Sequence, residues 1–364
     1  MQSLGYEEFL DIALGGTILG TGGGGSHRTA KALADGWLRR KTIQTTPLSK
    51  VPAEASVVVV AGMGSPEAML RVPFTTQAQS AFASIEESMG ERIRYVLPVE
   101  ASGFNFLTPM TVAAHEAVTV VDADCAGRAI PRLNQTLPFA GGIHLTPMAL
   151  GNAPGETVVI RTDSYALAEK LALSALEDFG WVAGLACYPM KGSSAKRTCI
   201  SGTISLAGEV GKAIREAIAS EQDPVPAVLR KMGGAILVRG TVERVSTDSK
   251  GSYTFGLVDV RGRGEYRGCH VRVMSMNENM IAWRNRRPAA LAPDRICYMK
   301  TDGSATTNAD LKPDDEVVVL VLEAQKEWRS KAASGLFSDT LRAMGYPGRY
   351  VPARKLLRMG KSAG

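Results

Sequence analysis

The chain has 364 residues, of which 45% are hydrophobic and 21% charged, the composition of an ordinary globular protein with room for about two domains. Its net charge of +6 argues little for nucleic-acid binding, because four basic residues, Arg354, Lys355, Arg358 and Lys361, lie in a tail, 354–364, that contains no acid. No apolar run approaches the roughly 18 residues of a membrane span and the amino terminus lacks a secretion signal, so we expect a cytoplasmic protein that binds neither nucleic acid nor membrane.

A run of glycines separates the first two predicted helices, residues 6–19 and 26–38. Five of the six positions from Gly20 to Gly25 are glycine, and Ser26 is a suitable cap for the second helix. A dinucleotide-binding loop needs a strand before its glycines and a Walker loop needs Lys-Ser/Thr after them, and this run has neither. A tight connection between helices explains one or two glycines. The run therefore predicts a close approach to a ligand or a facing loop, with ligand binding assigned to Gly22, Gly23 and Gly24.

Strands and helices alternate through the next hundred residues. Apolar segments predict strands at 56–61, 93–97 and 117–121, and helical patterns lie between them at 76–89 and 108–115. In the second of these helices Thr108 is the expected cap and Pro109 the first residue. This order predicts an α/β domain with a mainly parallel sheet and flanking helices.

Polar residues follow each of the three strands. In a parallel sheet the loops after the strands open on one edge, where ligands bind. The loops 62–66, 100–105 and 122–128 therefore predict a single crevice. From these loops we take ligand-binding residues Gly64 and Ser65, and catalytic residues Glu100, Asn105, Asp124 and Arg128.

The third strand ends in two aspartates, one residue apart. Asp122 and Asp124 lie at this point, and Gly141-Gly142-Ile143 can bring His144 toward the same edge. Carboxylates and an imidazole can bind a divalent cation, with zinc as a candidate, so Asp122, Asp124 and His144 form the predicted metal site. Two simpler explanations stay open. An aspartate pair after a strand often caps turn amides, and a lone histidine is more often a structural residue.

The five cysteines are odd in number and include no Cys-x-x-Cys motif. This argues against a disulfide framework and a zinc finger and predicts reduced, mainly buried thiols. Cys125 is the exception, because its position in the acidic turn leaves a reactive or metal-facing role open.

The pattern changes in the last third of the chain. Alternating or β-branched segments at 235–245, 252–260, 266–275 and 316–323 predict a β-rich domain, either a sandwich or a small barrel. Asn277-Glu278-Asn279 ends one of these strands, and a turn explains this triplet as well as ligand binding across the domain boundary does. We expect an α/β domain at 1–162, a second domain at 163–353 that is β-rich after 233, and the basic tail at 354–364.

Several of these segments together resemble the thiohydantoin desulfurase-like proteins of hydantoin utilisation. The similar segments lie in the same order over nearly the whole chain: 19–25, 62–66, 100–105, 122–131, 201–205, 276–282 and 292–297. Three positions depart from the family pattern, which usually has Asp after the glycine run where this chain has Ser26-His27, Gly at Cys125, and a second glycine near Ala101-Ser102.

The resemblance implies a small-molecule substrate of the hydantoin or thiohydantoin type and a metal-assisted hydrolase that removes sulfur from the ring. A metal-bound hydroxide would attack the ring carbon, Arg128 or the glycine-loop amides would stabilise the anion, and Asn105 would bind the ring amide. Two other hypotheses stay open: a non-catalytic ligand-binding or accessory subunit of a hydantoinase/oxoprolinase-type system, and a nucleotide-dependent enzyme. A homo-oligomer is compatible with the sequence.

Overall fold

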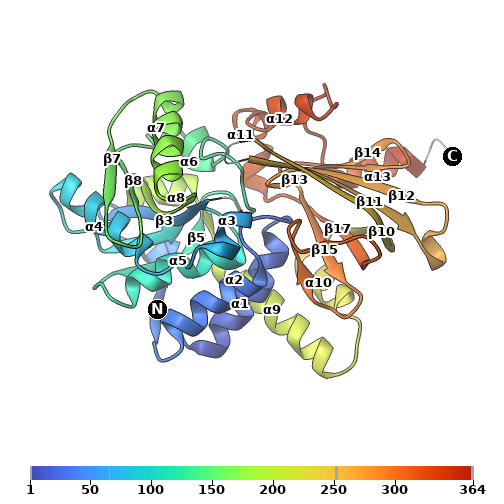
Figure 1. The fold of residues 1–364 in the computed structure, drawn as a ribbon, viewed down its shortest axis with the longest axis horizontal. Coiled ribbons are helices and arrows are strands. Elements are labelled where there is room, and N and C mark those ends of the chain that lie inside the picture. The colour runs from blue at the N-terminus through green and yellow to red at the C-terminus, as the bar shows by residue number, and fades with distance from the viewer. Residues whose placement is uncertain (1, 65, 251–252, 362–364) are drawn as a thin grey trace.

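The computed structural model describes residues 2–64, 66–250 and 253–361, which form two domains side by side (Figure 1). Each domain is built on one sheet, as expected for an α/β domain followed by a β-rich one. Within the described ranges, none of the helices has both the length and the apolar character needed to cross a membrane.

The first sheet has nine strands, ordered β1-β2-β5-β4-β3-β8-β6-β7, with β9 paired to β5. Its centre, β2-β5-β4-β3, is parallel as predicted, and its flanks are antiparallel. The strands are β1 Gln2–Leu4, β2 Ile43–Pro47, β3 Ser56–Gly64, β4 Tyr95–Pro98, β5 Thr119–Asp124, β6 Met148–Gly151, β7 Thr157–Ile160, β8 Val182–Lys191 and β9 Ile200–Ser201. Residue 162, the expected domain boundary, follows β7, and two more strands join this sheet after it.

Helices cover both faces of the first sheet (Figure 1). They are α1 Tyr6–Leu19, α2 His27–Leu33 with a π-helical turn η1 Ala34–Leu38, η2 Leu48–Lys50, α3 Pro66–Arg71, α4 Gln77–Met89, α5 Gly103–Ala113, α6 Leu137–Ala140, α7 Tyr165–Asp178, α8 Gly192–Thr198, α9 Thr203–Ala219 and α10 Val225–Met232. The bounds of α1 and the serine cap of α2 agree with the sequence prediction.

Helix α5 begins earlier than predicted. Its cap is Ser102, whose Oγ accepts a hydrogen bond from the Asn105 amide, and Pro109 lies inside the helix. The prediction of a start at Thr108-Pro109 is therefore wrong. The reason is packing: Gly103 lies so close to α1 that an added Cβ would be 2.5 Å from the Ala13 carbonyl oxygen. Contact with α1 stabilises the first turn of α5 despite the missing amide N–H of the proline.

The second domain is one antiparallel sheet of eight strands, ordered β14-β13-β12-β11-β10-β17-β15-β16, rather than the two sheets of a sandwich. The strands are β10 Ala235–Lys250, β11 Tyr253–Gly262, β12 His270–Met276, β13 Glu278–Arg284, β14 Arg287–Leu291, β15 Arg295–Lys300, β16 Ala305–Thr306 and β17 Glu316–Leu322. The helices are η3 Gly264–Tyr266, η4 Lys326–Arg329, α11 Lys331–Gly335, α12 Ser338–Ala343 and α13 Ala353–Lys361. Helix α13 occupies most of the expected basic tail and packs on β14.

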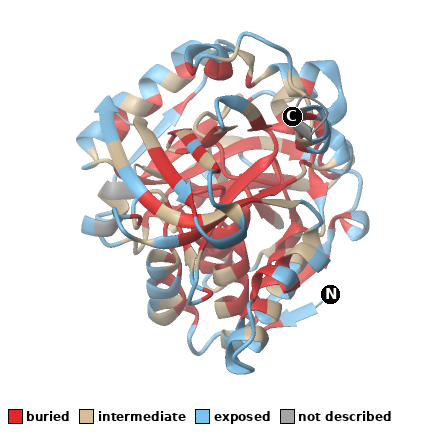
Figure 2. Cartoon of the chain, turned by 90° about the vertical axis from the view of Figure 1, so that its right-hand side faces the viewer, coloured by how far each residue is buried: buried red, intermediate tan, exposed pale blue. Residues whose placement is uncertain are grey.

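Buried residues, red in Figure 2, gather on the strands and inner helix faces at the centre of the molecule. One apolar cluster joins Val121 and Leu185 of the first sheet to Met280 and Trp328 of the second domain. The two domains therefore share a core, and their contact is stabilised by apolar burial. All five cysteines are free and buried, as predicted for four of them. Cys125, for which the sequence left a reactive or metal-facing role open, is also fully buried.

Candidate functional site

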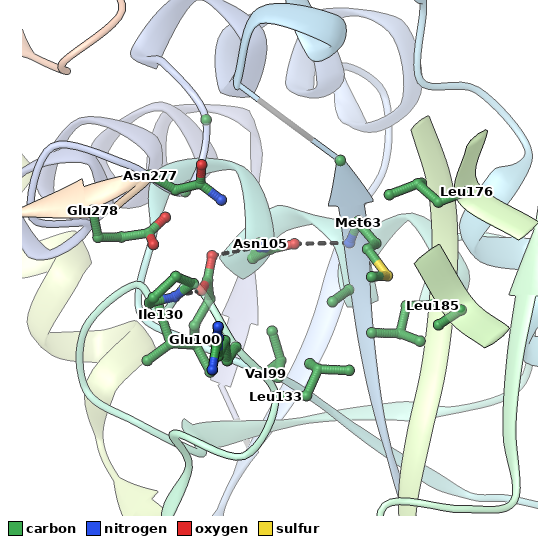
Figure 3. Close-up of a pocket in the computed structure, with 18 of the residues that line it drawn as sticks. Met63, Val99, Glu100, Asn105, Ile130, Leu133, Leu176, Leu185, Asn277 and Glu278 are labelled. Atoms are coloured by element: carbon green, nitrogen blue, oxygen red, sulfur yellow. Dashed lines mark hydrogen bonds between the residues drawn. The ribbon is translucent and has the colours of Figure 1, made fainter. Parts of the chain in front are cut away.

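A small cavity lies between the two domains, at the carboxyl ends of β3 and β4 (Figure 3). Its volume is about 100 Å³, below the roughly 300 Å³ of pockets for drug-sized ligands, so a fitting ligand is small. The first domain contributes the end of β3, the glycine loop and α7, and the second contributes the turn before β13. The polar lining residues are Glu100, Asn105, Arg132, Glu169, Tyr253, Asn277 and Glu278.

Glu100 is held from three sides by hydrogen-bond donors. Its Oε1 accepts from Asn105 Nδ2 at 2.7 Å and Ser102 Oγ at 3.3 Å, and its Oε2 accepts from the Ile130 amide at 2.8 Å. Burial raises the pKa of Glu100 from 4.5 to about 7, although these donors oppose the shift. Near neutral pH the carboxyl group is therefore present in both protonation states.

Glu278 enters the same cavity from the second domain. Its carboxyl group points toward that of Glu100 (Figure 3). Burial, and then the negative charge of Glu100, raise the pKa of Glu278 well above its usual range, while the nearby Arg128 cation and the Gly24 amide oppose the shift. Its Oε2 is buried and has no hydrogen-bond partner within the described residues. An unsatisfied polar atom in a cavity wall is a position where a ligand can bind.

Asn105 links Glu100 to the end of β3. Its Oδ1 accepts from the Gly62 amide at 2.8 Å, and its Nδ2 donates to Glu100. Asn105 therefore orients the Glu100 carboxylate and keeps one further hydrogen-bond position on each polar atom. Gly64 lines the cavity as expected, whereas Ser65 lies outside the described residues.

The glycine run contacts the second domain closely, as predicted for a facing segment. A Cβ on Gly22 would be 2.6 Å from Asn279 Nδ2, and one on Gly23 would be 2.3 Å from Glu278 Oε1. Gly24 has a φ of +67° and lines the cavity. The absence of side chains here is what allows Glu278 to reach the cavity beside the main chain of the loop.

Asn277 and Glu278 of the triplet 277–279 line the cavity, whereas Asn279 has a structural role. Asn277 lines the cavity, and its Oδ1 accepts from the Thr254 amide. Asn279 is fully buried away from the cavity, where its Nδ2 donates to the Ile296 carbonyl and its main-chain N–H donates to Thr21. Of the triplet, Glu278 and Asn277 can touch a ligand, and Asn279 positions the glycine loop.

The far end of the cavity is mainly apolar, lined by Met63, Val99, Leu133, Leu176 and Leu185 (Figure 3). Four polar side chains that contact one another border this end. Tyr165 and Tyr253 both donate to Glu169 Oε1, at 2.8 and 3.1 Å, and the Arg132 guanidinium stacks on the Tyr253 ring. The cavity thus offers carboxyl groups at one end and apolar surface at the other.

Asp122 is not part of this cavity. Its Oδ1 accepts from the Ile204 and Ser205 amides, and its Oδ2 accepts from Ser205 Oγ at 2.6 Å, so it caps helix α9. The expectation that Asp122 lies in the crevice as a metal ligand is therefore corrected. The turn after β5 reaches the cavity later, through residues 130–133.

Asp124 is completely buried behind the cavity. Its Oδ1 accepts from the Ala126 and Gly127 amides, so the simpler explanation of capped turn amides accounts for it. Burial raises the pKa of Asp124 to about 6. The residue stabilises the turn that carries Arg128.

The predicted metal ligands do not come together. His144 is exposed, Asp122 caps a helix and Asp124 binds turn amides. Among the described residues, no group of three His, Cys, Asp or Glu side chains is arranged to hold a metal ion. The described residues therefore do not fit the expected ion.

Arg128 joins the two domains rather than lining the cavity. Its guanidinium donates to Thr21 Oγ1 and to the carbonyl oxygens of Asn279 and Asp294, at 2.7 to 3.2 Å. Burial lowers its pKa to about 10. Arg128 is therefore a positioning residue that holds the glycine loop against β13.

The sequence analysis missed several contributors to the cavity, among them Arg132 and Glu169. Ser102 donates to Glu100, the Ile130 amide donates to the same carboxylate, and Tyr253 borders the apolar end. Ser102 stands three residues before Asn105, a spacing typical of a helix cap, and this pattern could have identified it. For Ile130 the contact is made by main chain, which sequence does not mark.

Two family models match consecutive parts of the chain. Residues 7–162 match "S-Me-THD-like, N-terminal domain" and residues 162–353 match "S-Me-THD-like, C-terminal domain". The chain belongs to the S-Me-THD-like family. This confirms the resemblance to thiohydantoin desulfurase-like proteins that the sequence motifs indicated.

A crystal structure of a protein from Chromobacterium violaceum is similar to this S-Me-THD-like chain. The two are 26% identical with a TM-score of 0.84, and the likeness covers 97% of this chain and 100% of that one. A search of curated proteins found no match.

The three departures from the usual S-Me-THD-like pattern have different structural positions. Ser26 caps α2, Cys125 is fully buried, and Ser102 is a hydrogen-bond donor to Glu100. Only the last of these touches a cavity carboxylate. Ser102 is therefore the departure that bears most directly on the site.

Proposed function

We propose that the protein hydrolyses the ring carbon–sulfur bond of a thiohydantoin or an S-methylated thiohydantoin, with Glu100 as general base and Glu278 as general acid. The observation that carries this proposal is the pair of buried carboxyl groups from different domains in one small cavity, one of them with a free oxygen. Membership of the S-Me-THD-like family supports the substrate class.

The different pKa shifts support different roles for the two carboxyl groups. Glu100, with a pKa of about 7, is substantially ionised at neutral pH and can accept a proton. Glu278, whose pKa is raised further by the charge of Glu100, holds its proton. Two acids whose environments separate their pKa values are a common arrangement for acid–base catalysis.

The proposed reaction balances with water as the only co-substrate. Glu100 removes a proton from water as the oxygen bonds to the ring carbon that carries sulfur, and the electrons of the C=S or C=N bond move to sulfur or nitrogen. In the C=S form, sulfur takes the Glu278 proton and the hydroxyl proton of the intermediate, and hydrogen sulfide leaves as the carbon–sulfur bond breaks. In the S-methyl form, the hydroxyl proton passes to the ring nitrogen, and Glu278 protonates the sulfur as methanethiol leaves. The product is a ring carbonyl, and transfer of the proton from Glu100 to Glu278 restores the starting state.

The cavity lining suits a small ring with polar edges. Asn105 and Asn277 supply amide groups near the carboxyl pair, so they can pair with the N–H and C=O groups of the ring. The apolar residues at the far end, including Leu133 and Leu176, can receive a ring substituent. A neutral ring avoids placing a further charge beside the ionised Glu100.

The experiment supplies the purified full chain with a thiohydantoin and its S-methyl derivative, and measures hydantoin together with sulfide or methanethiol. We expect turnover by the wild type and a loss of at least about 100-fold in kcat for Glu278→Gln and Glu100→Gln. Glu265→Gln, a change on the exposed surface of the second domain, is the matched control. Binding of the ring without turnover would reject catalysis and favour the accessory role.

A further inference from the structure

Strand β7 forms an open edge of the first sheet. In the described part of the chain it pairs with β6 alone, and it lies at the end of the sheet away from the second domain (Figure 1). Residues 153–159 are exposed, and the strand Thr157–Ile160 contains no charged residue or proline. Natural edge strands are usually protected by such residues or by a covering segment, because an open edge can pair with another strand.

The register of β7 shows which backbone groups point outward. The Asn152 amide donates to the Glu156 carbonyl across the β6–β7 pair, so residues 156, 158 and 160 direct their hydrogen-bonding groups toward β6. By alternation, the N–H and C=O groups of Thr157, Val159 and Arg161 point toward the open edge. Three successive outward positions centred on Val159 are therefore available for pairing.

An apolar patch surrounds this edge. Six large hydrophobic side chains are exposed in the described chain, and four of them belong to β7 or to α7, which contacts it: Val158 at 37%, Val159 at 40%, Leu167 at 46% and Leu171 at 44%. Ser84 of α4 donates to Thr157 Oγ1, whereas Ile160 belongs to the apolar cluster that includes Ala168 of α7, so the strand alternates between the two helices. Val158 therefore faces the same side of the sheet as the exposed leucines of α7.

We propose that two copies of this chain associate through β7, antiparallel and about a twofold axis at Val159, to give one continuous sheet. This register matches all outward groups, places Val159 against Val159 of the second copy, and opposes Val158 to Ile160. Helix α7 of each copy then lies on the same face, where Leu167 and Leu171 can pack together.

Sedimentation velocity and light scattering on the full chain test this proposal. We expect wild type and the conservative variant Val159→Thr to have twice the 38.7 kDa mass of one chain. Val159→Asp and Val159→Lys place like charges on the axis, so each alone should raise the dimer dissociation constant at least about tenfold. Mixed in equal amounts, these two variants should form a heterodimer, because opposite charges then meet.

The mixing experiment separates strand pairing from a folding defect, since two unfolded variants would not restore each other. Ile218→Asp is the matched control, because Ile218 is equally exposed at 42% but lies on α9, and this variant should remain a dimer. A monomeric wild type, a larger assembly, dimers of both charged variants alone, or a mixture that stays monomeric would each overturn the proposal.

Discussion

Replacing Glu100 by glutamine should remove a large pH dependence from the stability of the protein. Burial raises the pKa of Glu100 from 4.5 to about 7, so the folded state binds this proton more tightly than the unfolded state does. The contribution of Glu100 to the free energy of unfolding is therefore fully present below pH 4.5, falls as pH rises through 7, and is lost above that. The pKa difference corresponds to about 3 kcal/mol lost between pH 4.5 and 8.

Urea unfolding of wild type and Glu100→Gln at pH 5, 6, 7 and 8 measures this effect directly. The variant loses hydrogen bonds from Asn105 or Ile130, which lowers its stability at every pH, but this constant loss leaves the slope unchanged. We expect the variant to lose about 2.5 kcal/mol less than wild type between pH 5 and 8, and Glu265→Gln to behave like wild type. Identical slopes for wild type and Glu100→Gln would refute the assignment of a raised pKa to Glu100.

Three further predictions separate structure from catalysis. Asp122→Ala should destabilise the fold by about 1–2 kcal/mol, as loss of a helix cap does, and leave kcat of the folded protein unchanged. A loss of kcat beyond tenfold would show that Asp122 acts in the site. Arg128→Lys should lower the free energy of unfolding in urea by about 3 kcal/mol, because buried carbonyl groups lose their hydrogen-bond donors. An unfolding midpoint equal to that of wild type would contradict the role of Arg128 in holding the two domains together. Gly23→Ala should reduce turnover at least about tenfold, because the added Cβ would lie only 2.3 Å from Glu278 Oε1 and displace that side chain. Gly36→Ala is the control and should be neutral, since no atom lies within 4 Å of the added Cβ. Equal activity of the two variants would reject this packing argument.

The sequence placed Glu100 in the predicted crevice for a simple reason: it follows a buried parallel strand, so its position followed from the rule for strand ends. For Glu278 the sequence left a turn and ligand binding equally open, because its position beside Glu100 depends on contact between the two domains. Asp122 and Asp124 also follow a parallel strand, but they bind main-chain amides instead of lining the cavity. Asp122 binds amides of residues 204 and 205, about eighty positions away, and local sequence carries no mark of such a partner.

The helix starts show the same division between local and distant causes. Ser26 caps a helix as its local sequence predicts, because the cap and the amide it binds are three residues apart. The early start of α5 depends instead on contact between Gly103 and α1, which lies ninety residues earlier. Likewise, the single curved sheet of the second domain depends on which strands pair, and alternation alone does not specify partners.

The location of the cavity has a thermodynamic consequence. Since Glu100 and Glu278 come from different domains, a ligand that touches both binds only while the domains remain in contact. Ligand binding and the adhesion of the domains are therefore linked equilibria: at a hundredfold excess over its dissociation constant, such a ligand adds about 2.7 kcal/mol to the free energy that keeps the two halves together. Any compound that occupies the cavity should accordingly protect the interdomain segments from proteolysis.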